Sequence, residues 1–519
     1  MENRSPSRVV FSIFLSIILV FFLIPVVIFV SIPFLIYREA IIIAAKLLKR
    51  DEFDAPVAPL SAAQGPEDIY RGEGRINSTA CLLTLRGPPD IEKIRRVLTE
   101  RVFNRRDPKT GKLVNPVLSQ NVVHWCGYPF WRRLTTFDEQ ENVHAYQNDE
   151  NFTCTLKFAE ELTKKLTYTP FRHDKPVWEI IILPNLISDD SKPSSLPEFG
   201  IIFLGHHVLT DGFNLLRTFQ QMSDTAEEFN FIKPRDYLHG LTSKKQSYWV
   251  GQVVKWVKFS LRVPKELAEF LADLILNETW RKVYEEGAKF KKGPLHGASR
   301  GEGVIVKKAE KLVDVSNLSK IKEIYGVSGT SVLFSAIAGA VRNSIFTPGS
   351  HIPGSVLITT PLPLPSAGAK LENSFTMGFL NIGLANPDPV ARLKQVHAEV
   401  EKLKGSTLPG VIALCLKLIG CLPRSLIDSI FARGANSSVI TVSNLAGPKG
   451  KSDVAGHELL SYNVTLGAQA GAKVLGVYVS SIRGKLQIKV SGDVQTLHSE
   501  EKADLFVKNF EKELEYLLK

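Results

Sequence analysis

Residues 200–212 read G-I-I-F-L-G-H-H-V-L-T-D-G and give the strongest local indication of the fold. The first residues, Gly200–Leu204, are apolar and partly β-branched, which predicts a short buried strand. His206 and His207 follow where that strand ends, a place where functional side chains are common. Adjacent side chains in an extended segment point to opposite sides, so only one of the two histidines can face a reaction channel. Gly212 then allows a sharp turn, because glycine has no Cβ to clash.

Histidine suits proton transfer because its ordinary pKa is about 6.5. A neutral imidazole can take a proton from an attacking hydroxyl and return it to a leaving thiolate. Two other roles are open to a histidine pair, namely metal ligands and hydrogen-bonded core residues. No Cys, Glu or third His lies nearby at ligand spacing, which disfavours a metal site. The complete H-H-x-x-x-D-G pattern after a strand favours a catalytic role.

H-H-x-x-x-D-G is the signature of the coenzyme A-dependent acyltransferase superfamily, and residues 206–212 resemble it. Three further segments narrow the resemblance to the bacterial and plant wax ester synthase/diacylglycerol acyltransferases. Phe171–Glu179 is similar to that family's P-L-W-E segment, and Ser443–Pro448 to its S-N-V-P-G-P segment. Asp388–Leu393 is similar to a recurring piece of its C-terminal half. The resemblance runs in order over roughly residues 70–515 and leaves out the N-terminus.

The resemblance implies a role for each residue of the histidine motif. His207 would be the general base, and Gly212 would shape the loop. Asp211 would be structural, turned away from the substrate and paired with a basic residue. The candidate catalytic residues are therefore His206, His207, Asp211 and Gly212, and the candidate substrate-binding residues are Thr210, Ser443, Asn444 and Gly447.

The segment from the second half would lie near the site, between the two halves. Asn444 and backbone amides near Gly447 are candidates for stabilising the tetrahedral intermediate. Two positions depart from the family: Thr330-Ser331 stands where Asn-Asp is frequent, and Leu445-Ala446 replaces Val-Pro. These departures leave two alternatives open. One is an acyltransferase for a non-lipid acceptor, and the other is a catalytically silent lipid-binding or lipid-transfer protein on the same scaffold.

The fold implied is α/β, with two chloramphenicol-acetyltransferase-like halves, a tunnel between them and an N-terminal membrane helix. Acyl-CoA would enter the tunnel from one side and the alcohol from the other. The expected division of the chain is a membrane anchor at 1–50, a linker at 51–69, a first half with the histidine motif at 70–240, a basic amphipathic connecting region at 241–299 and a second half at 300–519.

Local patterns predict the main elements of both halves. Pro176 and Trp178 are expected in the core of the first half, and Pro361 is expected to end a strand. Leu408–Phe431 is apolar and is expected to be a core helix. The predicted strands are Ala80–Leu85, Glu179–Leu183, Gly200–Leu204, Ser355–Thr360, Ser438–Val442 and Val474–Ser480, the predicted helices are Ile91–Phe103, Thr330–Ile345 and Ser499–Leu518, and Ser188–Pro197 is a predicted loop.

The N-terminus carries a long apolar run. Val9–Tyr37 contains no charged residue and exceeds the roughly 20 residues that cross a bilayer. Its length and the lack of an A-x-A site favour a retained anchor over a cleaved signal peptide. Pro25 and Pro33 leave open both a straight span and a re-entrant hairpin. Basic residues are more numerous after the run than before it, which places the catalytic body in the cytoplasm, at the membrane of the endoplasmic reticulum.

The net charge and the cysteine content limit which partners and which redox compartment suit this chain. The net charge of +11 favours anionic partners, but no nucleic-acid-binding motif is present. The five cysteines form no C-x-x-C pair and suit a reducing compartment. We expect no metal and no cofactor, acyl-CoA as a substrate, and a lipid alcohol or diacylglycerol as the acceptor at a membrane. The predicted function is transfer of a long-chain acyl group from acyl-CoA to that alcohol.

Overall fold

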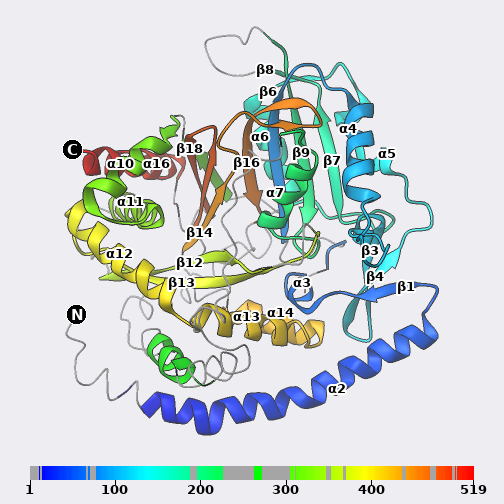
Figure 1. Ribbon diagram of the computed structural model, residues 1–519, viewed down its shortest axis with the longest axis horizontal. Helices are drawn as coiled ribbons and strands as arrows, with labels where there is room; N and C mark the ends of the chain where they lie inside the picture. Colours follow the sequence, from blue (N-terminus) through cyan, green and yellow to red (C-terminus); the bar gives the residue numbers. More distant parts are fainter. Residues whose placement is uncertain are drawn as a thin grey trace.

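The computed structural model describes most of the chain (Figure 1). The described residues are 11, 14–65, 68–70, 77–187, 196–225, 257, 262–271, 304–309, 311–346, 352, 354–365, 370–434, 440–467, 475–493, 497 and 499–519. Most of the predicted connecting region 241–299, most of the predicted loop Ser188–Pro197 and the start of the strand predicted at Ser438 lie outside them.

The first half is built on a six-stranded sheet in the order β15-β16-β2-β9-β7-β5. Each strand is antiparallel to its neighbours except β5, which is parallel to β7. The bounds are β15 Asp453–Val454, β16 His457–Leu466, β2 Ser78–Arg86, β9 Glu198–His206, β7 Trp178–Leu183 and β5 Val143–Ala145. The predicted strands of this half are confirmed, each extended by one or two residues at one or both ends.

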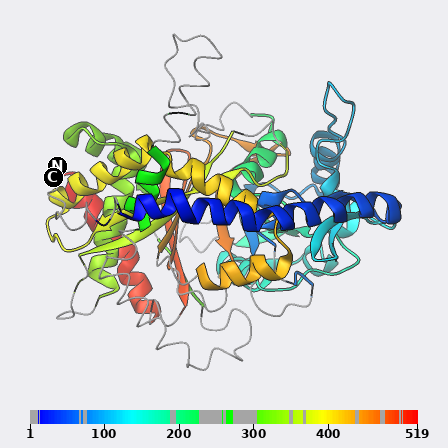
Figure 2. The same cartoon turned by 90° about the horizontal axis from the view of Figure 1, so that it is seen from below.

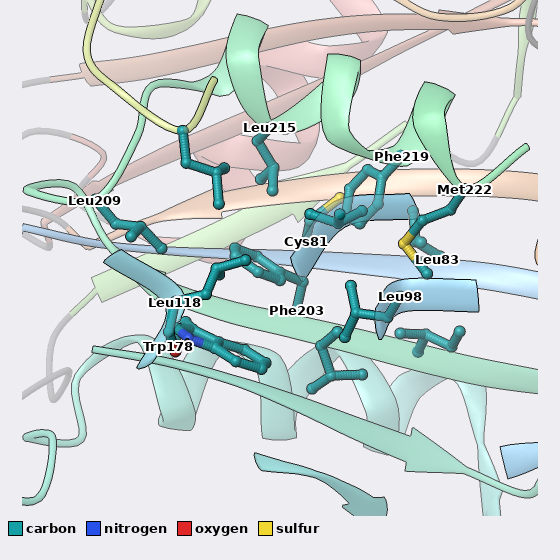
Figure 3. Packing of buried hydrophobic residues seen from close by; sticks show 14 of the residues in the cluster. Cys81, Leu83, Leu98, Leu118, Trp178, Phe203, Leu209, Leu215, Phe219 and Met222 are labelled. Carbon is teal, nitrogen blue, oxygen red and sulfur yellow. Dashed lines mark hydrogen bonds between the residues drawn. The ribbon is translucent and has the colours of Figure 1, made fainter. Parts of the chain in front are cut away.

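Helices cover both faces of this first sheet. On one face, α4 (Ile91–Leu98) and α7 (Gly212–Gln221) enclose a large apolar cluster. Figure 3 shows Leu215 and Phe219 of α7 above Cys81 and Phe203 of the sheet, with Trp178 in the same layer. On the other face, α6 (Leu156–Thr167) packs on the outward-pointing residues of the same strands. Trp178 is 1% exposed and its ring N–H donates to a backbone carbonyl, so its predicted core role is confirmed.

The second half is built on a seven-stranded sheet in the order β10-β18-β17-β14-β12-β13, with β11 paired to β18. The helices α10, α11, α12 and α16 cover one face of it (Figure 1). The strand bounds are β10 Val304–Lys308, β11 Val313–Asp314, β12 Ser355–Pro363, β13 Phe375–Gly383, β14 Ile440–Ala446, β17 Leu475–Ile482 and β18 Lys485–Asp493. The helix bounds are α10 Val315–Tyr325, α11 Gly329–Ser344, α12 Pro389–Gly405 and α16 Glu500–Leu517.

Strand β16 joins the two halves. It comes from the second half of the chain, yet it pairs along its length with β2 in the first sheet. A chain boundary between 240 and 300 therefore does not separate the two sheets cleanly, because the first sheet takes two strands from residues 453–466. The two halves are consequently docked by backbone hydrogen bonds as well as by side chains.

The N-terminal apolar segment is one continuous helix after a π-helical turn. The turn covers Leu19–Leu23, and α2 runs from Ile24 to Leu48 straight through Pro33, so the hairpin alternative is wrong for the described residues. By length and composition alone, Pro25–Leu48 could cross a membrane. The bent pair α10 and α11 passes the same test together, but α11 is largely buried in the second half. Figures 1 and 2 show α2 lying along one side of the body.

The end of α2 is attached to a small three-stranded sheet in the order β1-β4-β3. Ile42 and Ala45 pack with Tyr128 and Phe130, and the Tyr128 hydroxyl donates to the Phe34 carbonyl at 3.3 Å. The strands are β1 Phe53–Pro56, β3 Gln120–Trp125 and β4 Tyr128–Arg133, and a separate pair is formed by β6 (Thr153–Thr155) and β8 (Asn185–Ile187).

The predicted linker at 51–69 is wrong. It contains β1 and the short helix α3 (Pro59–Ala62), in which Leu60, Ser61 and Ala62 are buried. The Pro and Ala content that suggested a linker is also compatible with a helix. Pro59 stands at the first position of α3, where the missing backbone N–H has no intrahelical partner to lose.

Two other predictions are corrected. Strand β12 does not end at Pro361 but continues to Pro363. Its parallel partner β14 pairs with it only at Ile358 and Thr359. Pro361 therefore lies beyond the last residue paired with β14, where no backbone N–H is needed for a hydrogen bond to that strand. The expected core helix Leu408–Phe431 is two helices, α13 (Leu408–Ile419) and α14 (Arg424–Gly434). Both lie on the surface, since Leu414 and Leu426 are exposed.

Candidate active site

The histidine motif occupies the junction between β9 and α7, as the pattern predicts. His206 is the last residue of β9, and its backbone N–H donates to the Val177 carbonyl at 2.9 Å. The N–H of His207 donates to the Asn77 carbonyl at 2.7 Å, so the backbone stays tied to its neighbours one residue beyond the strand. The position of the second histidine is thus set by the sheet.

His206 is buried and holds the loop. Its ring Nδ1 accepts the backbone N–H of Val208 at 3.1 Å, and its ring lies edge-on to Phe171 with centroids 6.2 Å apart. A hydrogen bond to the backbone two residues ahead stabilises the turn that follows the strand. The structure therefore assigns the first histidine to loop geometry, although it is one of the candidate catalytic residues.

His207 is partly exposed and is oriented by Asn373 from the second half. Its ring Nδ1 lies 3.1 Å from Oδ1 of Asn373. The amide nitrogen of Asn373 donates to the backbone carbonyl of His207 at 2.6 Å and to the hydroxyl oxygen of Ser61 at 3.0 Å. These two bonds fix which end of the amide faces the ring, so the ring contact must be an Nδ1–H donor to a carbonyl oxygen. The neutral ring then carries its lone pair on Nε2, the nitrogen suited to accept a proton.

Phe375 adds an apolar wall beside the imidazole. It begins β13, two residues after Asn373, and the centroids of its ring and the His207 ring are 5.9 Å apart. The surroundings of His207 thus come from the first sheet, from α3 and from the second half, as expected for a residue between two halves.

Asp211 is buried at the seam between the halves. Its carboxylate caps α7 by accepting the N–H of Asn214 at 2.9 Å, and it accepts the N–H of Ser374 at 2.6 Å. Burial raises the pKa of Asp211, and the hydrogen bonds from Ser374 and Asn214 oppose that rise. The structural role is as predicted, but the hydrogen-bond partners are amides and not a basic side chain. The Arg217 guanidinium lowers the pKa of Asp211 through its charge and donates its hydrogen bond to Asn214.

Thr210 and Gly212 lie on either side of Asp211. The Thr210 side chain is buried and its hydroxyl donates to the Asp211 carbonyl at 3.3 Å. Gly212 is the first residue of α7 and does not take a positive φ. A Cβ at this position would lie 3.5 Å from Leu445, which is ordinary contact. The predicted need for glycine in a sharp turn is therefore wrong.

The segment at the end of β14 approaches the histidine loop through Leu445, which packs in the core of the first half. Ser443 lies on the same face of the strand, because side chains alternate. Asn444 lies on the opposite face, shared with Ile440 and Val442 in the helix-covered core of the second half. The alternation of the strand therefore gives no support for a place of Asn444 in the site, which stays a prediction.

Gly447 is required by close backbone approach. A Cβ there would lie 2.6 Å from the Tyr462 ring and 2.7 Å from the Ser481 carbonyl oxygen. Its N–H donates to that same carbonyl at 2.8 Å, so this amide is already used and is not a donor for an oxyanion. The glycine fixes the path of the chain beyond β14. This close packing explains the glycine without any contact to a substrate.

Four residues of the site were missed from the sequence: Ser61, Asn373, Ser374 and Phe375. Asn373 is separated from His207 by 166 positions and stands in no recognisable motif. No local signal could have found it, because its role depends on how the two halves dock.

The predicted tunnel through the site stays a prediction, because neither of two cavities that described residues line reaches His207. Among those same residues, no group of three or more His, Cys, Asp or Glu side chains is arranged to hold a metal ion.

Residues 371–517 match the family model of the WS/DGAT C-terminal domain, which places Asn373, Ser374 and Phe375 within the matched segment. The chain is thus similar to the wax ester synthase/diacylglycerol acyltransferases, and the model of their C-terminal domain matches its second half. The resemblance drawn from the motifs is confirmed, and so is an acyltransferase fold.

Sequence relatives agree with this family. Two Mycobacterium tuberculosis proteins, from different strains, whose names carry a provisional diacylglycerol O-acyltransferase assignment are each 23% identical over 310 residues. The match covers 56% of this chain and 62% of each relative, so the chain spans less than two thirds of their length.

Solved structures share the fold at low identity. The wax ester synthase/diacylglycerol acyltransferase from Marinobacter aquaeolei VT8 is 13% identical with a TM-score of 0.52, over 89% of this chain and 100% of that one. The trichothecene 15-O-acetyltransferase of Fusarium sporotrichioides is 12% identical with a TM-score of 0.56, over 90% and 95%. The starter condensation domain of rhizomide synthetase, solved with C8-CoA, is 11% identical with a TM-score of 0.51, over 92% and 96%.

Proposed function

We propose that this chain acts as a wax ester synthase/diacylglycerol acyltransferase, and that it transfers a long-chain acyl group from acyl-CoA to a lipid alcohol, either a fatty alcohol or diacylglycerol. The observation that carries the proposal is the pairing of His207 with Asn373. It holds the imidazole at the seam between the halves with Nδ1 as the hydrogen-bond donor, so Nε2 is the nitrogen with which the neutral ring can take a proton.

The reaction uses His207 as general base and then as general acid. Nε2 takes the proton of the acceptor hydroxyl as the oxygen attacks the thioester carbonyl carbon. The tetrahedral intermediate collapses with cleavage of the carbon–sulfur bond, and the imidazolium returns the proton to the leaving thiolate of coenzyme A. An ester and free coenzyme A are the products, and no cofactor or metal takes part.

The family supports acyl-CoA as the donor. The name of the Marinobacter relative gives ester formation as its activity, and the rhizomide domain was solved with an acyl-CoA. The excess of basic residues in this chain suits a donor that carries several phosphates.

A membrane location suits a poorly soluble acceptor. α2 is long and apolar enough to cross a bilayer, and the basic residues after the apolar run favour a cytoplasmic body at the endoplasmic reticulum. Asn151 provides the test of orientation, because it is exposed and begins an N-x-T sequon. A glycan on Asn151 would place the body in the lumen. Asn463 is a poorer reporter, since it lies within β16 and accepts a hydrogen bond from Lys489.

The decisive experiment compares two histidine variants in isolated membranes. Wild type, His207→Gln and His144→Gln are supplied with labelled acyl-CoA and a fatty alcohol or diacylglycerol. His144 is the matched control, because it is half-buried and hydrogen-bonded to Glu179 outside the site. We expect His207→Gln to lose about 100-fold or more of ester formation and His144→Gln to stay close to wild type. Equal ester formation by wild type and His207→Gln, or none by wild type with any acceptor, would favour a silent lipid-binding protein.

A further inference from the structure

A cavity of about 450 Å³ lies away from His207, at the β13 edge of the second sheet. The helix at residues 262–271 covers it, and the junction of α12 and α13 closes another side. Its apolar lining comes from both sheet and helices: Leu357, Phe379, Leu403, Leu408 and Phe270. Charged side chains of both signs stand among the remaining lining residues, including Arg262, Lys265 and Lys402. The apolar walls of this space suit an alkyl chain.

One face of β13 connects this cavity to the imidazole. Phe375, beside His207, shares that face with Met377, Phe379 and Asn381, because side chains alternate along a strand. Leu380 and Ile382 point the other way, into the core of the second half. At about 3.3 Å per residue, Phe379 lies roughly 13 Å along the strand from Phe375. The distance suits an extended alkyl chain with its polar end at His207.

The paired strand β12 makes most of this path apolar. Directly opposed residues share a face, and Pro363, Pro361, Thr359 and Leu357 stand opposite Phe375, Met377, Phe379 and Asn381. The Thr359 hydroxyl is buried and hydrogen-bonded within the sheet. Figure 1 shows the β12–β13 hairpin running from the helices of the second half towards α3 and the seam. The hairpin thus presents a mostly apolar face, with the site at one end and the cavity at the other.

The helix over the cavity contacts the N-terminal apolar segment. The Ser16 hydroxyl donates to the Pro264 carbonyl at 3.4 Å. The Glu266 carboxylate holds the same helix to the body by accepting from Ser406 and from both the N–H and the hydroxyl of Thr407 at 2.7–2.8 Å. Figure 2 shows α2 crossing the same side of the molecule. A lipid that leaves a bilayer beside the anchor would therefore meet this cavity.

We propose that this cavity at the β13 edge binds the alkyl chain of the membrane lipid alcohol whose hydroxyl His207 deprotonates. The inference rests on the proposed function. The position beside the anchor assigns the chain to the acceptor and not to acyl-CoA, which reaches the protein from the aqueous side.

Asn381 offers a clean substitution. Its side-chain oxygen is buried in the cavity wall and has no hydrogen-bond partner among the described residues. Asn381→Phe therefore removes no hydrogen bond and places a ring in the space that the chain would fill. Leu505→Phe is the matched control, because Leu505 is exposed on α16, away from the cavity.

Catalysis is tested in two arms, with the full chain in membranes. In the first, the acceptor is varied from decanol to octadecanol with one acyl-CoA. In the second, acyl-CoA length is varied with one alcohol. We expect Asn381→Phe to lower kcat/KM for hexadecanol by about tenfold, roughly the worth of two buried methylenes, and to leave decanol within about twofold. The dependence on acyl-CoA length should not change, and Leu505→Phe should match wild type. An equal loss for every alcohol, or a changed preference for acyl-CoA length, would overturn the assignment.

A binding readout separates this proposal from the proposed function. Hexadecanol with a diazirine at its tail is photolysed with His207→Gln protein, alone and combined with Asn381→Phe. Label on Phe270 or Phe379 that disappears with Asn381→Phe supports the cavity, even if wild type makes no ester. Label elsewhere in both proteins overturns the cavity, even if wild type is an active acyltransferase.

Discussion

The side chain of Asn373 binds His207 at two points, accepting at the ring Nδ1 at 3.1 Å and donating to its backbone carbonyl at 2.6 Å. The two residues belong to opposite halves of the chain and are 166 positions apart. Because one amide makes both contacts, the docking of the halves sets the rotation of the ring and its tautomer together.

Removing this amide should impair catalysis without abolishing the fold. Asn373→Ala should lower kcat by roughly 10- to 100-fold, since general-base catalysis contributes about 10²–10⁴-fold and the ring would lose its orientation. Asn373→Asp should move the acidic limb of the kcat/KM profile to higher pH, because a negative charge beside the ring favours its protonated form. The measurement is ester formation against pH. Asn185→Ala, a change in an exposed asparagine of β8, is the control, and an unchanged profile in Asn373→Asp would argue against the pairing.

The two motif glycines should respond oppositely to alanine. A Cβ on Gly212 would touch Leu445 at 3.5 Å, whereas one on Gly447 would lie 2.7 Å from the Ser481 carbonyl oxygen. Gly212→Ala should change the free energy of unfolding by less than about 1 kcal/mol. Gly447→Ala should lower it by about 1–3 kcal/mol, because backbone has to move. Denaturant unfolding in detergent checks both, and equal effects would contradict the contacts described.

The histidine loop could be predicted because its signals are local. An apolar β-branched run followed by a polar motif and an amphipathic run indicates strand, loop and helix within residues 198–221, and β9 and α7 have these positions. The position of Ser499 could be predicted in the same way. It is a serine directly before a charged amphipathic run, and it caps the N-terminus of α16.

What failed, or stays a prediction, depends on contacts between distant parts of the chain. Ser61 was assigned to a linker because its neighbours are Pro- and Ala-rich, yet it is buried and bonds Asn373. Asn444 was placed in the site by resemblance, but the register of β14 turns it to the opposite face. Neither the hydrophobic period nor the spacing of residues indicates which residues of the two halves come into contact. The sequence therefore contained no signal for the role of Asn373.

A buried ion pair should make the second half sensitive to single substitutions. Arg392, in the family-like segment Asp388–Leu393, is fully buried and pairs with Glu513 of α16. Arg392→Met or Glu513→Leu alone should cost about 3–5 kcal/mol of unfolding free energy, because each leaves a buried charge unpaired. The double variant should recover much of that loss.

The exposed pair of Lys485 and Asp314 gives the control for this cycle. Asp314→Asn should change the free energy of unfolding by less than about 1 kcal/mol. Additive losses in the Arg392→Met/Glu513→Leu double variant, measured in the same denaturant series, would show that the two side chains do not act as a pair.

Because of Lys489, the free energy of unfolding should increase as the pH rises through the alkaline range. It lies on β18 but donates to Thr465, Val464 and Asn463 of β16, and so joins the two sheets through neutral oxygens at 2.6–3.2 Å. Burial lowers the pKa of Lys489 to about 8, whereas an unfolded lysine has a pKa of about 10.4. Between these values the unfolded chain holds a proton that the folded chain has released, so the free energy of unfolding increases with pH.

The variant Lys489→Met isolates this effect. Relative to the variant, wild type should gain roughly 2 kcal/mol of unfolding free energy between about pH 7.5 and about pH 9.5, because the cost of a buried charge disappears as Lys489 loses its proton. Below about pH 7.5 the difference should level off, since both states of the wild type are then protonated. Paired denaturant unfolding of the two proteins in detergent measures it. A difference that stays constant across this range would mean that Lys489 keeps its charge in the folded protein and that its three acceptors fully replace water.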